Sequence, residues 1–407
     1  MHVELHDTLA DDRRAEQASA LISACVHCGF CLATCPTYLD TGDERDSPRG
    51  RIYLVKQLLE QGDAGSITRN HLDRCLTCRS CETTCPSGVQ YGHLGDMGRA
   101  LVEEMAPRSR PERALRRTLR AVLRRPRLFG GFLRVGQWLR PLMPQALARK
   151  VPPRQYTGEW PPAVHPRRML VLAGCVQSAA TPRTNAAAAR VLDRLGISLV
   201  EVPRAGCCGA LDYHLGAQDA GLDAARRNID AWWRELEDGA EAIVSCASGC
   251  GAMLADYAAL LADDPDYAAR AAAVGAAHRD LAEILDAEDL ALLAPVPGAE
   301  PIAVHLPCSQ QHALGHAGLV RRILARTGFT LAATRDDHLC CGSAGTYSLL
   351  QAETSERLRR RKLAALCTGQ PGSIVTANVG CQLHLSAASE VPVHHWIEML
   401  DPARLDD

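Results

Sequence analysis

The chain has 407 residues, 47% of them hydrophobic, and a formal net charge of −2. This length predicts two or three domains, and the near-neutral charge gives the whole chain no electrostatic preference for a partner. No window approaches 18 uninterrupted apolar residues, which excludes a predicted membrane span. The polar start MHVELHDTLADDRRAEQ lacks the apolar stretch of a signal peptide. Because the chain has 18 cysteines and no predicted export signal, we expect it in a reducing cytoplasm.

Residues 1–105 carry two copies of the spacing C-x2-C-x2-C-x3-C-P, which predicts a two-cluster ferredoxin-like domain. The copies are Cys25, Cys28, Cys31 and Cys35 before Pro36, then Cys75, Cys78, Cys81 and Cys85 before Pro86. In bacterial two-cluster ferredoxins, three thiolates of a run bind one [4Fe–4S] cube and the fourth reaches the other cube. We therefore expect one cluster on Cys25, Cys28, Cys31 and Cys85, and a second on Cys75, Cys78, Cys81 and Cys35.

Zinc and disulfides are the alternatives for these eight thiols. Structural zinc prefers two separated ligand pairs, and disulfide frameworks belong to small secreted chains. Between the two runs, residues 46–61 place apolar side chains at helical spacing, which predicts a helix over the clusters. Arg49 and Arg51 at its start either face solvent or neutralise cluster charge.

Residues 106–166 form a predicted basic connecting segment. Between positions 108 and 150, twelve arginines and Lys150 stand against one acid, Glu112. Leu115 and Leu119 fall on one helical face, Pro126 breaks the pattern, and a second apolar stretch follows at 128–139. Such a segment can lie on an anionic membrane surface, here the cytoplasmic face of the inner membrane. The alternatives are docking on a partner subunit or on its own chain, or a plain linker; no nucleic-acid-reading motif accompanies the charge.

From residue 167 onward the chain repeats itself, which predicts a duplicated domain at 167–298 and 299–407. The first copy reads Cys175, Cys207-Cys208-Gly209, Cys246-x3-Cys250; the second reads Cys308, Cys340-Cys341-Gly342, Cys381. The copies are offset by 131 to 133 residues, and Cys246 aligns with Ala377. Cys367 lies outside both patterns and is expected in the core.

Each copy alternates short apolar runs with helical stretches, which predicts a parallel α/β fold. The expected strands are 169–173, 197–202, 242–245, 302–305, 329–332 and 373–376. The predicted fold class is thus α+β and α/β multidomain, a helical two-cluster ferredoxin-like domain before a duplicated α/β cysteine-rich domain. The cysteines follow strand ends, where open α/β sheets bind ligands.

The repeated thiols predict further metal or cluster sites. A third site is expected on Cys175, Cys207, Cys208, Cys246 and Cys250. A fourth set, Cys308, Cys340, Cys341 and Cys381, lacks one thiol. The alternative is that this half binds no cluster and retains only the fold, or docks a partner. The alternative for both sets is that these cysteines only pack in the core, because free cysteine is often buried.

No catalytic residue is predicted on this chain. It has no G-x-G-x-x-G after a strand, no P-loop and no C-x-x-C-H haem motif. His305, His312, His316, His394 and His395 are interpreted as structural or supporting residues. Because oxidation of an organic substrate needs a hydride or proton acceptor, that chemistry is expected on a partner chain carrying a flavin.

The duplicated C…CCG…C pattern resembles the cysteine-rich domain of heterodisulfide reductase subunits. That family includes the iron–sulfur subunits of glycolate oxidase, anaerobic glycerol-3-phosphate dehydrogenase and lactate utilisation. The whole combination looks most like the glycolate oxidase (glycolate dehydrogenase) iron–sulfur subunit. The strings that carry this resemblance are CVHCGFCLATCPTY, DSPRGRIYLVK, CLTCRSCETTCPSGVQYGHL, HLPCSQQH, CCGSAGTYS, TANVGCQLHL and VPVHHWIEML.

The resemblance implies an electron-transfer subunit with two [4Fe–4S] clusters. Its partners would be an FAD-binding catalytic subunit and a second flavoprotein-like subunit, with electrons leaving towards a membrane quinone. It further implies a non-cubane [4Fe–4S] cluster on the first cysteine-rich set, whereas the second set departs at Ala377. The open alternatives are a related lactate or glycerol-3-phosphate dehydrogenase subunit, a thiol or disulfide reductase, and a redox sensor or assembly scaffold.

Overall fold

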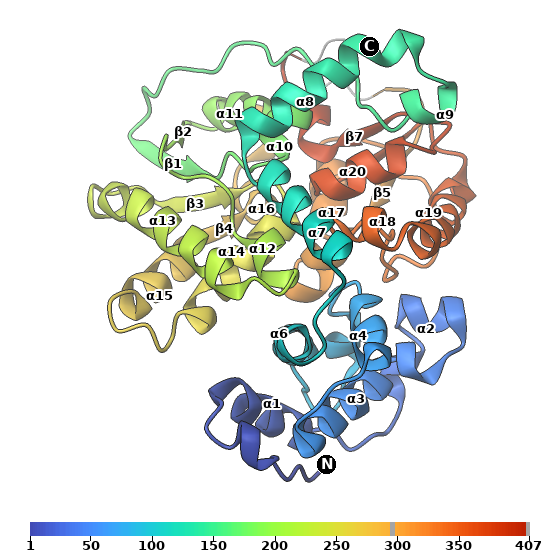
Figure 1. Ribbon diagram of the computed structural model, residues 1–407. Helices are drawn as coiled ribbons and strands as arrows, with labels where there is room; N and C mark the ends of the chain where they lie inside the picture. The colour runs from blue at the N-terminus through green and yellow to red at the C-terminus, as the bar shows by residue number, and fades with distance from the viewer. Residues whose placement is uncertain (294–297, 404–407) are drawn as a thin grey trace.

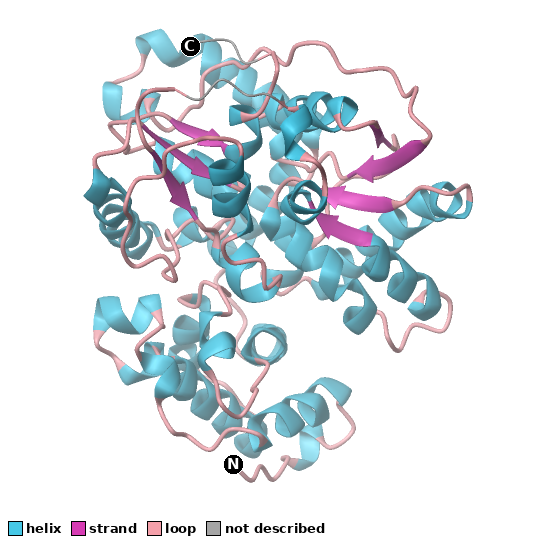
Figure 2. Ribbon diagram, turned by 180° about the vertical axis from the view of Figure 1, so that it is seen from behind, coloured by secondary structure: helices cyan, strands magenta, loops and turns pink. Residues whose placement is uncertain are grey.

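The computed structural model describes residues 1–293 and 298–403. It has a helical N-terminal unit, a helical connecting segment, and two α/β halves that each contain a parallel sheet (Figure 1). The predicted fold class is therefore confirmed. In Figure 2 the two sheets lie side by side, with the N-terminal unit below both.

The N-terminal unit is built from short helices around the cysteine runs. They are α1 (Arg13–Ser23), α2 (Pro36–Thr41), α3 (Pro48–Gln61), α4 (Ser66–Asp73), α5 (Ser80–Thr84) and α6 (Tyr91–Met105). Helix α3 is the helix predicted at 46–61. Its start is fixed by Ser47, whose hydroxyl accepts the Gly50 N–H, and by Pro48 at the first helical position. Gly62 ends it in the left-handed conformation that glycine adopts without strain.

The connecting segment folds into α7 (Arg110–Leu123), α8 (Pro126–Leu139) and α9 (Gln145–Ala148). Pro126 separates the first two helices and also begins α8, because proline fits the first helical position. In Figure 1, α7 climbs from the N-terminal unit across the α/β halves, and α8 continues over them. No helix among the described residues has the length and apolarity that crossing a bilayer requires.

The first α/β half holds a four-stranded parallel sheet in the order β2-β1-β3-β4. The strands are β1 (Arg167–Val171), β2 (Ile197–Glu201), β3 (Ala242–Ser245) and β4 (His278–Asp280). The helices are α10 (Gln177–Ala180), α11 (Arg183–Arg194), α12 (Ala210–His214), α13 (Gln218–Glu237), α14 (Ser248–Leu260), α15 (Ala268–Ala277) and α16 (Leu281–Ala287). From β1 the chain adds β2 on one side of the sheet and then β3 on the other side. The carboxyl ends of β1 and β3 therefore border the crevice where open α/β sheets bind ligands.

The second half repeats this topology with a shorter sheet, β5-β6-β7. Its strands are β5 (Ile302–His305), β6 (Ser373–Thr376) and β7 (Val393–His395), and its helices are α17 (Leu319–Arg326), α18 (Tyr347–Leu350), α19 (Ala352–Leu366) and α20 (Val379–Ser386). The strand predicted at 329–332 is wrong. Only Leu331 bridges to Ile302, because this edge segment exchanges two backbone hydrogen bonds with Ile302 and then leaves the sheet.

One apolar cluster joins the two halves. It contains residues of both sheets, such as Val171, Val244, Val304 and Val375, together with Trp396. The opposite face of each sheet is covered separately, since Ile243 belongs to a cluster of the first half and Ile374 to one of the second. The period-two alternation of strand side chains therefore decides which residues face the partner half and which face each half's own helices.

Candidate metal centres

The first cysteine run lines a cavity in the N-terminal unit. Its walls include Cys25, Cys28, Cys31 and, from the second run, Cys85 and Cys81. Gly29 lies between the thiols with a φ of 86°, a left-handed conformation that lets the chain wrap around the cavity. Burial raises the pKa of Cys31 to about 11, although the Arg49 N–H hydrogen bond lowers it in part.

A second cavity lies beside the first. It is lined by Cys75, Cys78, Cys81 and the distant Cys35. Cys81 and Tyr91 line both cavities, so the two sites are adjacent. The structure thus places the last cysteine of each run with the first three of the other run.

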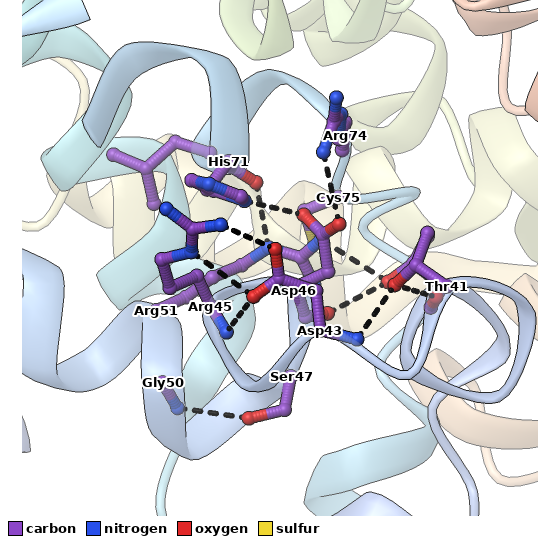
Figure 3. Close-up of polar contacts among 12 residues, drawn as sticks. Thr41, Asp43, Arg45, Asp46, Ser47, Gly50, Arg51, His71, Arg74 and Cys75 are labelled. Atoms are coloured by element: carbon purple, nitrogen blue, oxygen red, sulfur yellow. Dashed lines mark hydrogen bonds and ion pairs between the residues drawn. The ribbon is translucent and has the colours of Figure 1, made fainter. Parts of the chain in front are cut away.

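A buried charge network supports the second cavity (Figure 3). Asp46 is fully buried and accepts from His71 Nδ1 at 2.7 Å and from Arg74 Nη1 at 3.1 Å. Arg51 Nη2 lies 3.5 Å from the same carboxylate, and its Nε donates to the His71 carbonyl at 2.7 Å. Asp43 lies close enough to complete a cation site with Asp46 and His71, but two guanidinium groups already neutralise Asp46.

Arg51 carries its charge into the second cavity. Its side chain is only 1% exposed and lines the cavity wall, so it does not solvate the start of α3. Burial by itself would raise the pKa of Cys75, but the charges of Arg51 and Arg99 outweigh it and lower this pKa. Arg49 is less buried and pairs with Glu44 at 2.5 Å.

Arg99 is a site residue that sequence reasoning missed. It projects from α6, and its Nη2 donates to the Cys75 carbonyl at 2.7 Å while Nη1 donates to Thr77 at 2.8 Å. No local pattern marks it, because these partners lie 24 and 22 positions away along the chain. Only the packing of α6 against the cysteine loop brings its charge to the thiols.

Four of the five thiols predicted in the first half come together. Cys175 interacts with Cys207, Cys207 with Cys208, and Cys208 with Cys250. Hydrogen bonds from the Cys175 and Cys208 thiols favour the thiolate of Cys207, so the pKa of Cys207 lies below its ordinary value. The chain of thiols sits where β1, β2 and β3 end, as the position of the cysteines after the strands predicts.

Cys246 is not part of this group, contrary to the prediction. It follows β3 with the parity of Ala242 and Val244, and it packs in the apolar cluster between the two halves. Cys208 and Cys250 pack on the other face of the sheet. Burial raises the pKa of Cys246, with Asp280 and Glu201 adding to the rise, and no other thiol of the described chain is among the groups that shift it.

This placement changes how the second half is interpreted. Ala377, which aligns with Cys246, occupies the same cluster between the halves. The one thiol that the second half lacks is therefore the counterpart of Cys246. In the first half, Cys246 faces away from the other four thiols. Its own four thiols form the same chain as in the first half, with Cys308 Sγ 3.8 Å from Cys340 Sγ, Cys340 beside Cys341, and Cys341 beside Cys381.

The second set lies against the ferredoxin-like unit. Cys340 belongs to one apolar cluster with Leu76 and Tyr347, and Cys78 and Cys308 pack against this cluster. The charge of Cys308 is among the groups that raise the pKa of Cys78, after burial. Tyr347 Oη donates to the Arg74 carbonyl at 3.1 Å and fixes this contact. Cys78 is therefore shared between the wall of the second cavity and the surroundings of the second cysteine-rich set.

Arginines of α7 and of its two ends dock on the chain itself. Arg108 and Arg116 bind Asp73, at 2.6 and 3.1 Å. Arg120 Nε lies 2.5 Å from Asp212, which is 2% exposed, and Arg124 Nη1 lies 3.5 Å from it. Of the alternatives for this segment, docking on its own chain therefore describes these positions of α7.

Helix α8 and the turn after it differ, because their apolar side chains face solvent. Phe132, Val135 and Trp138 are exposed by 62, 56 and 78%, and Leu142 by 81%. Arg125, Arg127, Arg134, Arg149 and Lys150 are exposed around them. Cys367 is also exposed, so its expected place in the core is wrong; it follows the last turn of α19 on the solvent side.

The donor sets of the two N-terminal cavities fit iron–sulfur clusters. Eight thiols line them in two groups of at least four, with buried arginines to offset thiolate charge. Thiolates are the ligands that hold [4Fe–4S] clusters. The two cysteine-rich sets offer four thiols each and fit the same chemistry.

Comparison with known proteins agrees with this organisation. A family model described as a 4Fe-4S dicluster domain matches residues 21–89, and one described as a cysteine-rich domain matches residues 169–255 and 302–386. The glycolate oxidase iron-sulfur subunit of Escherichia coli K12 is 51% identical over 404 residues, which cover 99% of each chain. The probable glycolate oxidase iron-sulfur subunit of Bacillus subtilis 168 is 32% identical, covering 90% of this chain and 88% of the relative. Lactate utilization protein A of Bacillus velezensis is 28% identical over 226 residues, 53% of this chain and 91% of the relative.

Proposed function

The chain belongs to the family of glycolate oxidase iron–sulfur subunits, and from that premise we propose that it carries electrons away from glycolate oxidation on a partner flavoprotein. The observation that supports this proposal most is the pair of adjacent thiol-lined cavities in the N-terminal unit. The sequence carries no G-x-G-x-x-G after a strand, the pattern typical of dinucleotide binding. Substrate oxidation is accordingly placed on an FAD-binding subunit, accompanied by a second flavoprotein-like subunit.

The residues proposed to hold the first cluster are Cys25, Cys28, Cys31 and Cys85, and those for the second are Cys75, Cys78, Cys81 and Cys35. Bound there, [4Fe–4S] clusters supply reversible one-electron transfer. The protein's contribution is to exclude water and to balance charge. Arg51 and Arg99 place positive charge beside Cys75, which favours the thiolates that bind iron.

We further propose that each cysteine-rich half holds a cluster on its four-thiol set. Cys175, Cys207, Cys208 and Cys250 form the first set, and Cys308, Cys340, Cys341 and Cys381 form the second. Cys246 is left out of the first set because it faces the cluster between the two halves. The contact of Cys78 with the second set makes that set the neighbour of the ferredoxin-type clusters.

Replacing Cys28 by Ser in the intact complex tests the electron-carrying role. The variant should lose glycolate-dependent dye reduction, while glycolate still bleaches the flavin of the partner subunit. Cys367→Ser is the matched control, since this exposed thiol lies outside every set, and it should retain full dye reduction. If Cys28→Ser abolishes flavin bleaching as well, in a complex that remains assembled, the electron-carrying role is wrong.

The exposed face of α8 is proposed to bind an anionic membrane surface, towards which electrons would leave for a quinone. Phe132 and Trp138 present apolar rings to solvent, and Arg125, Arg127 and Arg134 surround them without ion pairs among the described residues. Amphipathic helices with this pattern bury their apolar face at the headgroup boundary and gain attraction from anionic lipids.

Flotation with vesicles of phosphatidylglycerol and phosphatidylcholine tests the membrane contact. The variant Phe132→Ser with Trp138→Ser should stay with the unbound fraction, while the wild-type complex floats. The control is Arg117→Glu, a charge reversal on exposed α7, which should bind nearly as well. Equal flotation of the double variant and the wild type would favour docking of α8 on a partner subunit.

A further inference from the structure

His305 has one ring nitrogen with no partner in the described structure. The residue ends β5, its side chain is 1% exposed, and Nδ1 lies 2.9 Å from the Thr376 hydroxyl. Nε2 is buried and makes no hydrogen bond. Leaving a buried polar atom unpaired destabilises a protein, so we expect this atom to have a partner.

The unpaired nitrogen belongs to a group of metal-ligating side chains. The ligand atoms of His305, Cys341 and Cys381 all lie within 4.8 Å of one another, and all three residues are buried. Strand alternation explains the grouping: Ile302 and Val304 face the cluster between the halves, so His305 falls on the opposite face, where Cys341 and Cys381 pack.

The hydrogen bond to Thr376 suits a ligand. Histidines that bind metals usually donate the N–H of their other nitrogen to an oxygen, which fixes the tautomer and the ring orientation. In the tautomer in which Nδ1–H donates to Thr376 Oγ1, the lone pair is on Nε2, the nitrogen grouped with the two sulfurs.

The first half shows that this histidine is not required by the fold. At the offset of 133 that relates Cys175 to Cys308, His305 corresponds to Leu172. Leu172 is buried in the same apolar cluster as Cys208, as His305 lies with Cys341. An apolar side chain therefore fills the equivalent position, and the imidazole is particular to the second half.

We propose that the second half holds a mixed cysteine–histidine iron–sulfur centre in which His305 Nε2 binds iron beside Cys341 and Cys381. This inference rests on the proposed cluster at the second four-thiol set. A neutral imidazole in place of a thiolate lowers the negative charge of a cluster and raises its reduction potential. The centre of the second half is then the one of higher potential, and the all-thiolate centre of the first half the one of lower potential.

The surroundings act in the same direction. The Lys362 side chain is 2% exposed, and its ammonium group donates to the carbonyls of Asp336 and Asp337 at 2.9 and 3.2 Å. Its positive charge lies near Cys341, Cys340 and Cys308. In the first half the buried Asn228, which is neutral, contacts the thiol loop through the Cys207 carbonyl at 3.0 Å. The cation that acts on Cys207 there is Arg124, which is more exposed to solvent than Lys362.

The test compares His305→Leu and His305→Cys in the full-length, anaerobically purified chain. Pulsed EPR of the dithionite-reduced wild type should show a strongly coupled imidazole nitrogen on an iron–sulfur signal. Both variants should lose this coupling. His305→Cys should keep the wild-type iron content, with a lower midpoint potential for one centre, because a thiolate replaces the imidazole. His316→Leu, a histidine of the same half that pairs with Glu283, is the control and should keep the coupling.

Three results would overturn the inference: no nitrogen coupling in the reduced wild type, coupling that persists in His305→Cys, or zinc in place of iron at this set. The failure modes are separable. The wild type could contain well above the roughly eight iron atoms of two [4Fe–4S] clusters and yet show no nitrogen coupling. That result would reject His305 as a ligand but would support the proposed cysteine-rich clusters. Iron that does not exceed this number removes the proposed cysteine-rich clusters, and dye reduction reports the electron-carrying role independently of both.

Discussion

The two cysteine-rich halves share a four-thiol frame and differ in what surrounds it. In the first half, α7 lies close, with Arg124 near Cys207, and Leu172 fills the position at the end of β1. In the second half, the thiols touch Cys78 of the ferredoxin-like unit, and His305 takes the position of Leu172. The two copies thus share the arrangement of four thiols, but different residues surround the thiols in each copy.

The sharpest way to break this comparison is to remove equivalent thiols from the two halves. Cys340→Ser should lower glycolate-dependent dye reduction by at least the roughly 10- to 100-fold lost when a partner of a metal ligand is removed, because Cys340 is itself a proposed ligand and packs with Cys78. Cys207→Ser should lower it much less, because no thiol of the ferredoxin-like unit is among the groups that act on Cys207. Steady-state assays of the two complexes measure the difference, and equal losses would contradict a special role for the second half.

Variants of Cys246 and Cys250 compare, within one half, a thiol that only packs with a thiol that is a proposed ligand. Cys250→Ala should lose the iron of the first cysteine-rich set, measured as iron per chain. Cys246→Ala reproduces the residue found at position 377 and should keep that iron.

The expected cost of Cys246→Ala is a small cavity, about 1 kcal/mol, seen as a thermal midpoint a few degrees lower. Iron loss from Cys246→Ala that matches the loss from Cys250→Ala would return Cys246 to the ligand set.

Glu398 and Glu283 occupy comparable places after the last strand of each half. Glu283 caps α16 near the surface, whereas Glu398 is 6% exposed and accepts from Thr184 at 2.8 Å. Burial raises the pKa of Glu398 from the ordinary glutamate value of 4.5 to about 7. The folded state therefore holds its proton more tightly than the unfolded chain, and stability falls as pH rises from about 4.5 to 7, by up to about 3 kcal/mol.

Glu398→Gln removes this dependence. Its thermal midpoint should match that of the wild type near pH 5 and exceed it near pH 8, in scanning calorimetry of the isolated chain. The control Glu283→Gln should show no such widening. A wild-type midpoint that stays level with Glu398→Gln across this range would show that Glu398 is ionised without penalty.

The smallest effect is expected at Asp212, the residue of the first half on which α7 docks. Asp212 receives Arg120 and Arg124, and the equivalent position in the second half is Gly345. Because both guanidinium groups are partly solvated, Asp212→Asn should weaken the local contact by only about 1 kcal/mol. Hydrogen exchange of α7 amides should become about fivefold faster, while Arg117→Ala leaves it unchanged. Unaltered exchange in Asp212→Asn would mean that α7 is held by its other contacts, such as the pair of Arg116 with Asp73.

Sequence patterns predicted the parts of this protein that depend on local chemistry. The two cysteine runs, the helix between them and five of the six expected strands follow from spacing and periodicity, because those signals lie within a few residues of one another. The strand at 329–332 failed since its apolar run has a partner over only one residue. Cys367 failed because a helical apolar pattern does not say which residue follows the last packed turn.

The sequence by itself determined which residue types repeat and where each repeat begins, since the cysteine spacings and the CCG strings need no partner to be recognised. Tertiary structure alone decided which predicted thiol leaves its set and which other groups lie beside the thiols. Strand parity turned Cys246 away from its neighbours and turned His305 towards Cys341 and Cys381. Packing across more than 250 positions of chain brought Cys78 to Cys340, and α6 brought Arg99 to Cys75. The physical reason is that ligand sets and their charges depend on contacts between elements, and no local pattern encodes those contacts.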